Sequence, residues 1–516
     1  MKRNFAFLLL FSGLLLAKVN VAQYDNRDWY NDDFNMNSSR GISMNHLYSV
    51  IDSTQLKTIV VAVIDNGVDV YHEDLQGSIW TNEDEIADNQ IDDDGNGYID
   101  DIYGWNYLGN PSGQNVNQAN LEITRLFRAY SEKFDSVKVD TLKGAEIDEF
   151  AKFKSIQNTF EQETAKIKEQ FEQYSQLAAL YKGAYDYMRE KLDSSEVSVN
   201  NLISYQPESA DEEQIIEFLL MAEKEGLKDY LEDGGSYFDS ALNYHYNLDF
   251  NPRTVVNEEL LDSTGMMYGN NQVWAASPDH GTHVAGIIAA NRNNDIGVSG
   301  VAANAKIMCL RAVPDGDERD EDIARAITYA ADNGADVINM SFGKKYSPQT
   351  AMVENAIDYA LSKDIVIIHA AGNESTNIDE EYHYPRGLKG NNKSKKGFIT
   401  VGAHTRSDSV HLLANFSNYG EKSVDVMAPG EDIYSTISGN KYKKNSGTSM
   451  AAPVVAGLAA VYRGLFPEKS AQQIKKLILK SRVREKNLIT KTQDGELKLK
   501  DAVRHPGFLD TKEVFE

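Results

Sequence analysis

The apolar run at Thr58–Ile64 constrains the fold more than any other stretch of the chain. It reads TIVVAVI, is rich in β-branched side chains and does not alternate between polar and apolar positions. Such a run is typical of a central parallel strand that is buried on both faces. Asp65 follows directly, and open α/β sheets carry their sites at the carboxyl ends of strands. The stretch therefore predicts an α/β fold with a functional aspartate at Asp65.

A second stretch, residues 445–457, reads NSGTSMAAPVVAG. Its small residues allow a peptide backbone to approach closely, and its Ala-Ala-Pro segment suits the entry to a helix. Ser449 would then stand exposed at a helix N-terminus, where a hydroxyl can serve as a nucleophile.

A histidine in the stretch DHGTHVAG, residues 279–286, completes a set of three. The chain order Asp65, His280, Ser449 is one of the orders known for acyl-transfer triads. Each residue alone also has a structural interpretation, as a turn aspartate, a helix-capping histidine or a loop serine. Their order and their flanking residues together favour catalysis.

The three stretches together resemble the subtilisin-like serine proteases, the subtilases, over roughly residues 55–110 and 265–482. The resemblance implies a subtilisin-like α/β fold, with a mostly parallel central sheet and helices on both faces. It also implies a serine endopeptidase that acts on proteins or peptides, in which Asp65 orients His280, His280 takes the proton of Ser449 and water hydrolyses the acyl-enzyme. Asn66 departs from the family, which usually has serine or threonine there, but its amide can still form local hydrogen bonds.

The resemblance also identifies one edge of the substrate site. A predicted strand at residues 336–340 leads into a segment that matches the subtilase edge pairing with the peptide backbone, namely Ser341, Phe342 and Gly343. The peptide would add to this edge as a strand. In subtilases the same segment forms one wall of the pocket for the side chain before the scissile bond. Gly343 leaves room in that pocket, and Tyr384 and Pro385 resemble the loop that closes its far wall.

A further apolar run, residues 365–373, ends in Ala371, Gly372 and Asn373. We predict that Ala371 and Gly372 bind substrate. Asn373 matches the asparagine that stabilises the oxyanion in subtilases together with a backbone N–H, and such a fixed amide is worth about 3–4 kcal/mol.

Residues 91–101 read IDDDGNGYIDD and concentrate five carboxylates in one short loop. Like charges this close repel one another, whereas Ca²⁺ binds several oxygens and neutralises them. We predict a structural Ca²⁺ site with alternating ligands, namely Asp92, Asp94, Asn96, the Tyr98 carbonyl and Asp100. Tyr103 stands where an EF-hand has its closing glutamate, so a further ligand would come from Asp101, Asn82 or Glu85. The alternative is a solvated acidic turn, and no organic cofactor is expected.

The other candidate ligands are interpreted as structural. The spacing of four histidines does not suit a metal site: His369, His383, His404 and His411. The only cysteine, Cys309, lies in an apolar run and is expected to be a small core residue, because one thiol cannot build a disulfide framework.

Residues 1–22 predict a secretory signal peptide, because Lys2 and Arg3 precede an apolar run that ends in small residues and is too short for a membrane span. We therefore expect export to the periplasm or the outside of the cell, and no membrane span after the signal is removed. The net charge of −26 argues against a nucleic-acid partner, since binding to phosphates needs a basic surface.

Residues 113–244 leave the subtilase pattern, so that Asp65 and His280 lie 215 positions apart. An apolar residue recurs there at every seventh position: Phe153, Phe160, Ile167, Tyr174, Tyr181 and Met188. This period predicts a helix of roughly 40–50 residues with a narrow apolar seam. Weaker patterns at 121–134 and 210–231 predict flanking helices in an antiparallel bundle. The seam is interpreted as core, and the bundle would restrict substrate entry or dock a partner protein.

The chain thus divides into six predicted segments: a signal peptide (1–22), an N-terminal lead-in (23–57), a first catalytic part with the acidic loop (58–112), the helical insertion (113–244), a second catalytic part (245–482) and a C-terminal tail (483–516). The lead-in is shorter than the inhibitory pro-domain common in subtilases. We expect it to pack on the catalytic domain, and a residual pro-peptide is the alternative. Two alternative functions stay open: a processing protease that docks one partner through the insertion, and a non-catalytic binding protein. The four intact chemical positions argue against the second.

Overall fold

The computed structural model describes residues 27–33, 39–194, 196–256, 268–390, 393–407, 411–493 and 495–515. The predicted signal peptide, residues 1–22, lies outside the described residues. Within the described ranges, no helix is both long enough and apolar enough to cross a membrane.

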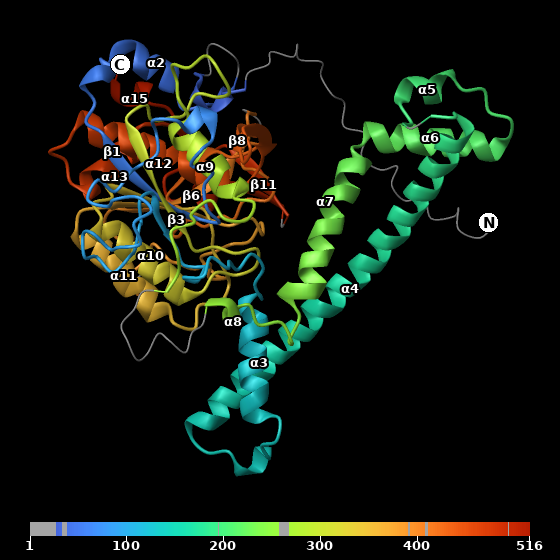
Figure 1. The fold of residues 1–516 in the computed structure, drawn as a ribbon, viewed down its shortest axis with the longest axis horizontal. Coiled ribbons are helices and arrows are strands. Elements are labelled where there is room, and N and C mark those ends of the chain that lie inside the picture. Colours follow the sequence, from blue (N-terminus) through green and yellow to red (C-terminus); the bar gives the residue numbers. More distant parts are fainter. Residues whose placement is uncertain are drawn as a thin grey trace.

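A seven-stranded parallel sheet forms the centre of the molecule, in the order β2–β3–β1–β4–β5–β6–β7 (Figure 1). Residues Val61 to Asp65 of β1, an inner strand of this sheet, are all buried, so the predicted buried parallel strand is confirmed. The strands of this sheet are β1 (Ile59–Asp65), β2 (Gly104–Asn106), β3 (Ala305–Arg311), β4 (Val337–Met340), β5 (Val366–Ala370), β6 (Phe398–His404) and β7 (Val426–Pro429).

Helices cover both faces of the sheet, because successive side chains of each strand point to opposite sides. Val63 of β1 and the buried Cys309 of β3 belong to a core shared with α9, α12 and α13. Ile64 belongs to the opposite core, shared with α10 and α11. The helices of the body are α9 (Asp279–Ala289), α10 (Asp320–Asp332), α11 (Thr350–Ser362), α12 (Thr448–Leu465) and α13 (Ala471–Lys480).

A helical arm, residues 122–245, extends from the body between β2 and β3 (Figure 1). The predicted long helix is present as α4, which has 47 residues and buries Phe153, Phe160, Ile167 and Met188 of the seam. The elements of the arm are α3 (Glu122–Phe134), η5 (Val139–Thr141), α4 (Ala145–Lys191), α5 (Val199–Ser204), α6 (Ala210–Lys224), α7 (Leu227–Ser240) and η6 (Ala241–His245).

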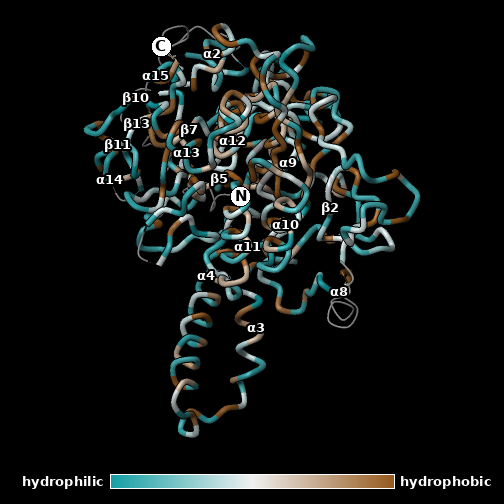
Figure 2. Tube along the Cα trace, turned by 90° about the vertical axis from the view of Figure 1, so that its left-hand side faces the viewer, coloured by the Kyte–Doolittle hydropathy of each residue, from teal (hydrophilic) through white to brown (hydrophobic). Residues whose placement is uncertain are grey.

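The arm is a set of antiparallel helices, as predicted. Figure 2 shows α3 and α4 running side by side away from the body, with hydrophobic and hydrophilic turns alternating along them. Phe127 of α3 stacks on Phe160 of α4, and Phe238 of α7 contacts Tyr174 farther along α4. The prediction of a single helix at 210–231 is wrong, because Gly226 adopts a left-handed conformation and separates α6 from α7.

The lead-in packs on the body, as expected, and contacts the C-terminal residues. Trp29 and Tyr30 are buried in the same core as β1. The Thr511 Oγ1 donates to the Ser43 carbonyl at 2.9 Å, and Lys512 pairs with Asp33 at 3.0 Å. The two ends of the described chain therefore stabilise one another on the body.

The shorter elements complete the description. They are η2 (Trp29–Asn31), α2 (Met44–Val50), η3 (Ser53–Gln55), η4 (Glu73–Leu75), α8 (Arg253–Val256), β8 (Ile433–Ile437), β9 (Lys441–Asn445), β10 (Arg482–Arg484), β11 (Ile489–Thr492), β12 (Gly495–Lys498), α14 (Leu499–Ala502), β13 (Gly507–Leu509) and α15 (Lys512–Phe515).

Candidate active site

Asp65 and His280 meet at the carboxyl end of β1. The His280 Nδ1 lies 2.7 Å from the Asp65 Oδ1, and the side chain of His280 is 39% exposed whereas that of Asp65 is 3% exposed. The Asn66 N–H donates to the same Asp65 oxygen at 2.8 Å. A buried carboxylate thus holds one nitrogen of an accessible imidazole, and the Nε2 is left for chemistry.

The start of α9 brings His280 to this position. Gly281 packs directly against the Gly67 carbonyl, and a Cβ at Gly281 would overlap with that carbonyl. The Asn66 Oδ1 accepts a hydrogen bond from the Gly281 N–H at 2.9 Å. Asn66, the residue that departs from the subtilase pattern, therefore ties the first turn of α9 to the end of β1.

The electrostatic environment of His280 suits a base. Burial lowers the pKa of its imidazole, but the negative charge of Asp65 and the hydrogen bond to it outweigh burial and raise the pKa above the ordinary value of 6.5. Asp65 therefore stabilises the protonated ring that forms when His280 takes a proton.

Ser449 lies in the first turn of α12, which has Gly447 as its N-cap. Pro453 of the same helix has no N–H, so the Ser449 carbonyl lacks its usual partner one turn later. The Ser341 Oγ donates to that carbonyl at 2.9 Å, and the Ser449 Oγ donates to the Ser341 carbonyl at 2.9 Å. The two serines therefore fix each other. Among the described residues the Ser449 hydroxyl makes no hydrogen bond to His280.

Thr448 holds Asn373 in one orientation. The Asn373 Oδ1 accepts hydrogen bonds from the Thr448 N–H at 2.8 Å and from the Thr448 Oγ1 at 3.0 Å. The Gly372 N–H in turn donates to the Thr448 Oγ1 at 3.0 Å. Because the Oδ1 of Asn373 is engaged by Thr448, the Nδ2 of Asn373 is the atom left to donate a hydrogen bond. A Cβ at Gly447 would lie 3.4 Å from this Nδ2.

The predicted substrate segments lie next to each other beside Ser449. β4 and β5 pair in parallel up to Met340 and His369, so the segments Ser341–Gly343 and Ala371–Asn373 follow side by side at the same edge of the sheet. The first contacts Ser449 through Ser341, and the second contacts the neighbouring Thr448 through Gly372.

The imidazole of His383 occupies the space between these segments. A Cβ at Gly343 would overlap with the His383 Nε2, and a Cβ at Gly372 would lie 2.7 Å from the His383 Cε1. The expectation that Gly343 leaves room in the pocket is therefore wrong, because a buried ring from a distant loop takes that room.

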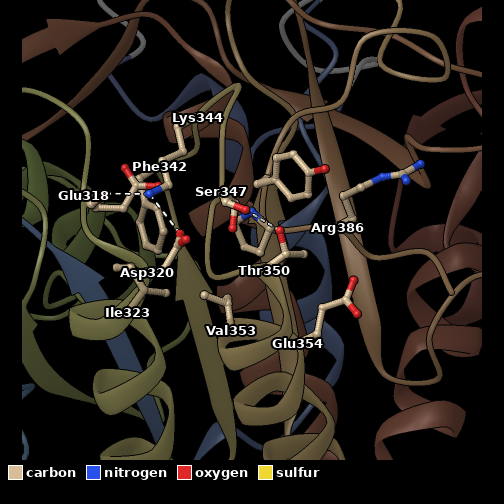
Figure 3. A pocket seen from close by; sticks show the side chains of 12 residues that line it. Glu318, Asp320, Ile323, Phe342, Lys344, Ser347, Thr350, Val353, Glu354 and Arg386 are labelled. Atoms are coloured by element: carbon tan, nitrogen blue, oxygen red, sulfur yellow. Dashed lines mark hydrogen bonds and ion pairs between the residues drawn. The ribbon is translucent and has the colours of Figure 1, made fainter. Parts of the chain in front are cut away.

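The buried Lys344 and the neighbouring Phe342 line a small pocket (Figure 3). The Lys344 Nζ lies 2.8 Å from the Glu122 Oε2 and 2.9 Å from the Asp320 Oδ1, and its side chain is 2% exposed. Burial lowers the pKa of Lys344, but the surrounding carboxylates outweigh it and raise the pKa. Glu122 is the first residue of α3, where the arm leaves the body, and Lys344 directly follows Gly343 of the predicted substrate edge. Their ion pair therefore joins the root of the arm to this edge.

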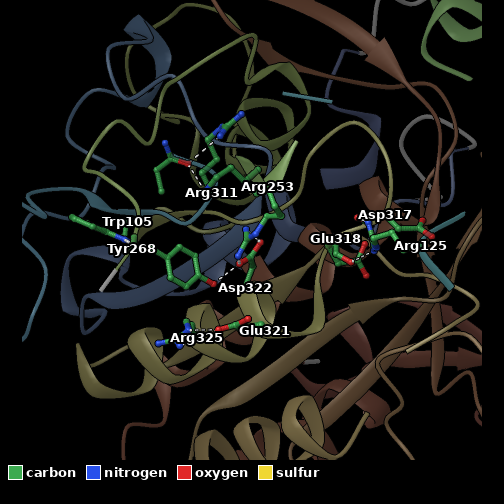
Figure 4. A network of polar contacts seen from close by, with 12 residues as sticks. Trp105, Arg125, Arg253, Tyr268, Arg311, Asp317, Glu318, Glu321, Asp322 and Arg325 are labelled. Atoms are coloured by element: carbon green, nitrogen blue, oxygen red, sulfur yellow. Dashed lines mark hydrogen bonds and ion pairs between the residues drawn. The ribbon is translucent and has the colours of Figure 1, made fainter. Parts of the chain in front are cut away.

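A second set of contacts holds the same root (Figure 4). Arg125 donates to the carbonyls of Asp317 and Glu318 at 2.9 and 3.0 Å. After the arm, Arg253 pairs with the buried Asp322 of α10 at 2.9 Å. Both ends of the arm are thus anchored in the body by ion pairs and hydrogen bonds.

The acidic loop brings two of the predicted calcium ligands together with one of the suggested additional ligands. Carboxylate oxygens of Glu85, Asp92 and Asp94 lie within 4.8 Å of one another. Burial raises the pKa of Glu85, and the charges of Asp101 and Asp94 add to the rise.

Of the other predicted calcium ligands, Asn96 contacts the cluster directly, because its N–H donates to the Asp92 Oδ1 at 3.0 Å and to the Asp94 Oδ1 at 2.9 Å. The Asn96 Nδ2 donates to the Asp94 Oδ2 at 3.0 Å, and the Asn96 Oδ1 accepts from the Tyr98 N–H at 2.8 Å. The Tyr98 ring is buried against Trp105, and the Tyr98 carbonyl as a calcium ligand stays a prediction. The Asp100 carboxylate accepts hydrogen bonds from the N–H groups of Asn89 and Gln90, whereas the Asp100 N–H donates to the Glu85 Oε2 at 3.0 Å.

Sequence reasoning did not identify three residues of this site: Thr448, His383 and Lys344. Thr448 could have been found, because it is a hydroxyl residue directly before Ser449. His383 also had a signal, because it directly precedes Tyr384 and Pro385, the predicted far wall of the pocket. Lys344 had none, since its partner Glu122 lies 222 positions away along the chain.

Comparisons with known proteins show the family of this chain. The subtilase family model matches residues 56–500. A thermophilic serine proteinase from Bacillus sp. (strain AK1) is 48% identical over 184 residues, which cover 36% of this chain and 42% of that protein. Subtilisin DY from Bacillus licheniformis is 40% identical over 198 residues, which cover 38% of this chain and 67% of that protein.

A cell wall-associated protease from Bacillus subtilis (strain 168) is 35% identical over 214 residues, which cover 41% of this chain and 22% of that protein. The chain thus spans less than half the length of the first and the last of these relatives. The family model nevertheless covers most of the chain and includes Asp65, His280, Asn373 and Ser449. This chain belongs to the subtilase family.

Proposed function

We propose that this protein is an exported serine endopeptidase that hydrolyses peptide bonds in proteins. The observation that carries the proposal is the 2.7 Å contact between the accessible His280 and the buried Asp65. The family membership and the position of Ser449 in the first turn of α12 support it. Export is proposed from the apolar segment at residues 1–22 and is consistent with a relative that is described as cell wall-associated.

The chemistry follows from the roles of these side chains. The Ser449 hydroxyl turns from the Ser341 carbonyl to the His280 Nε2, which takes its proton as the oxygen attacks the substrate carbonyl. The Asn373 Nδ2 and the Ser449 N–H donate to the oxyanion. His280 then gives the proton to the leaving amine. Water hydrolyses the resulting ester and restores Ser449.

The substrate backbone would lie along Ser341–Gly343 as an added strand, with Ala371 and Gly372 on the other side. The reciprocal bonds between Ser341 and Ser449 support this placement, because they hold the proposed nucleophile beside this edge.

Hydrolysis of an unfolded protein tests the proposal. The full chain should release peptides from denatured casein, and Ser449→Ala should reduce the rate to background. Ser446→Ala is the matched control, because the Ser446 Oγ accepts from the Asp432 N–H at 2.9 Å and takes no part in the proposed chemistry. Release of peptides by Ser449→Ala at the rate of the unchanged chain would refute the proposal.

We also propose that the acidic loop binds a structural Ca²⁺ through Glu85, Asp92 and Asp94. Their proximity supports the proposal, because three carboxylates this close repel one another unless a cation neutralises them. Thermal unfolding should shift upwards in Ca²⁺ relative to chelator, and a ligand at 100 times its Kd adds about 2.7 kcal/mol. Asp94→Asn should remove the shift, whereas Asp84→Asn, an exposed acid of the same region, should keep it. Equal midpoints in Ca²⁺ and in chelator would exclude the site.

Recognition of one partner protein by the arm is the second candidate function. Exposed aromatic rings on the arm favour it, among them Phe171, Tyr230 and Tyr237, which are 40%, 55% and 51% exposed. Tyr230→Ser with Tyr237→Ser should slow cleavage of that partner and leave cleavage of short peptides unchanged. Lys224→Ser on α6, which is 81% exposed, is the control. An equal loss of cleavage for the partner protein and for short peptides would argue against docking.

A further inference from the structure

His383 belongs to a loop that is fixed against the predicted substrate edge. The Lys344 N–H donates to the Tyr384 carbonyl at 3.1 Å, and the Tyr384 N–H donates to the Lys344 carbonyl at 2.9 Å. This pair of bonds holds His383 next to Gly343. The side chain is 6% exposed, and its ring lies 5.8 Å from that of His369.

The imidazole stands where both walls of the pocket lack a side chain. Gly343 comes from the segment after β4 and Gly372 from the segment after β5, and a Cβ on either would meet the ring of His383. Glycine walls of this kind normally leave space for a substrate side chain. In this chain the ring of His383 fills that space.

Packing rather than hydrogen bonding keeps the ring in place. Within the described chain, the buried Nε2 has no hydrogen-bond partner, and the Nδ1 lies 3.9 Å from the Glu374 Oε2. Burial lowers the pKa of His383, so the ring is neutral.

Glu374 adds a negative charge at the same place. Its carboxylate would lie 2.7 Å from a Cβ at Gly372, and its side chain is 42% exposed. An acidic substrate side chain that entered between the two glycines would meet this charge and be repelled.

We propose that His383 limits the substrate side chain before the scissile bond to small, uncharged residues such as glycine, alanine and serine. A large side chain must push the ring out of a close-packed position, whereas a small one fits above it. The inference rests on the proposed endopeptidase function, because it concerns the specificity of that site. It makes His383 a specificity-determining residue, although sequence reasoning interpreted it as structural.

Peptide p-nitroanilides that differ only in the residue before the scissile bond test the inference. For the full chain, kcat/KM should be at least tenfold higher with alanine than with phenylalanine, and lowest with glutamate. His383→Gly should raise kcat/KM for phenylalanine at least tenfold and change that for alanine less than threefold. His383→Gln, which keeps much of the volume, should keep the preference for alanine.

The control is His505→Gly, the same substitution at a partly buried histidine near the C-terminus, which should leave the ratio of alanine to phenylalanine unchanged. Mapping of cleavage sites in denatured casein by the unchanged chain is the second measurement and does not depend on any variant. Cleavage mainly after phenylalanine, tyrosine or leucine, or an unchanged ratio in His383→Gly, would overturn the inference and leave the endopeptidase function intact. Absence of Ser449-dependent turnover with every substrate would overturn both.

Discussion

The body and the helical arm use helices in opposite ways. Ser449 and Leu465 are the only residues of α12 that are not buried, so the helix that carries the proposed nucleophile is enclosed on nearly all sides. In α4 only six of 47 residues are buried, namely Phe153, Ile156, Phe160, Ile167, Ala184 and Met188. The body therefore fixes the geometry of a site, whereas the arm presents surface.

Charged residues show the same contrast. In the body, Asp65 and Arg253 are buried and paired. Along α4 the pair between Lys182 and Asp186 is exposed, and pairs of that kind contribute little to stability. The buried ion pair between Glu122 and Lys344 is the exception, because it lies where the arm meets the substrate edge. We therefore expect that substitutions of the proposed site residues in the body impair catalysis and that substitutions on the exposed surface of the arm do not.

Asp65→Asn should have the largest effect. The amide cannot stabilise a protonated His280, and loss of this carboxylate from a triad reduces kcat by about 10⁴-fold. Asp336→Asn is the matched control, because the Asp336 Oδ2 accepts from the Val60 N–H at the other end of the same strand. Peptide hydrolysis at the unchanged rate in Asp65→Asn would contradict the proposed role.

Asn373→Ala should come next, because it removes one donor to the oxyanion. We expect kcat to fall by about 10²–10³-fold with little change in KM. Thr448→Val should produce a smaller fall in kcat, since the amide keeps one of its two bonds to residue 448. A rise in KM with kcat unchanged would assign Asn373 to substrate binding instead.

A comparison of Ile64→Ala with Phe160→Ala separates the two regions directly. Ile64 is fully buried in the body, so its truncation should lower the free energy of unfolding by about 2–5 kcal/mol and reduce activity at elevated temperature. Phe160 is buried between α3 and α4, so its truncation should loosen the arm and leave peptide hydrolysis intact. Hydrogen exchange and peptide assays measure both effects. Equal loss of activity would show that the arm and the site are one cooperative unit.

The pH dependence of activity should give the smallest of these effects. His280 must be neutral to take a proton, and Asp65 raises its pKa above 6.5, so kcat/KM should rise with pH through a midpoint above 6.5. In Asp65→Asn only the lowering effect of burial is left, and the midpoint of the residual activity should move down. The contact between Asp65 and protonated His280 also stabilises the fold. This contribution is fully present below pH 6.5 and is lost as the pH rises through the pKa of His280 in the folded protein. A midpoint that does not move would show that another group controls the profile.

The sequence was sufficient where a signal is local. The buried run before Asp65, the helix start at His280 and the small residues around Ser449 each depend on neighbours along the chain, and the structure places them at one edge of the sheet. The seven-residue period predicted α4, because a helix repeats its contacts at short intervals.

The sequence was insufficient where a contact joins distant residues. His383 meets Gly343 across a loop, and Lys344 meets Glu122 across 222 positions. Asp100 is predicted to be a ligand from its spacing, and the spacing does not reveal that its carboxylate also accepts hydrogen bonds from the N–H groups of Asn89 and Gln90. Periodicity cannot report such contacts, because they depend on how separate segments pack.

Labelling of the full chain with a fluorophosphonate, followed by mass spectrometry, tests the central claim most directly. The account predicts an adduct on Ser449 that is absent in His280→Ala, because the hydroxyl reacts only when the imidazole takes its proton. An adduct on another serine, or an equal adduct in His280→Ala, would contradict the proposed triad.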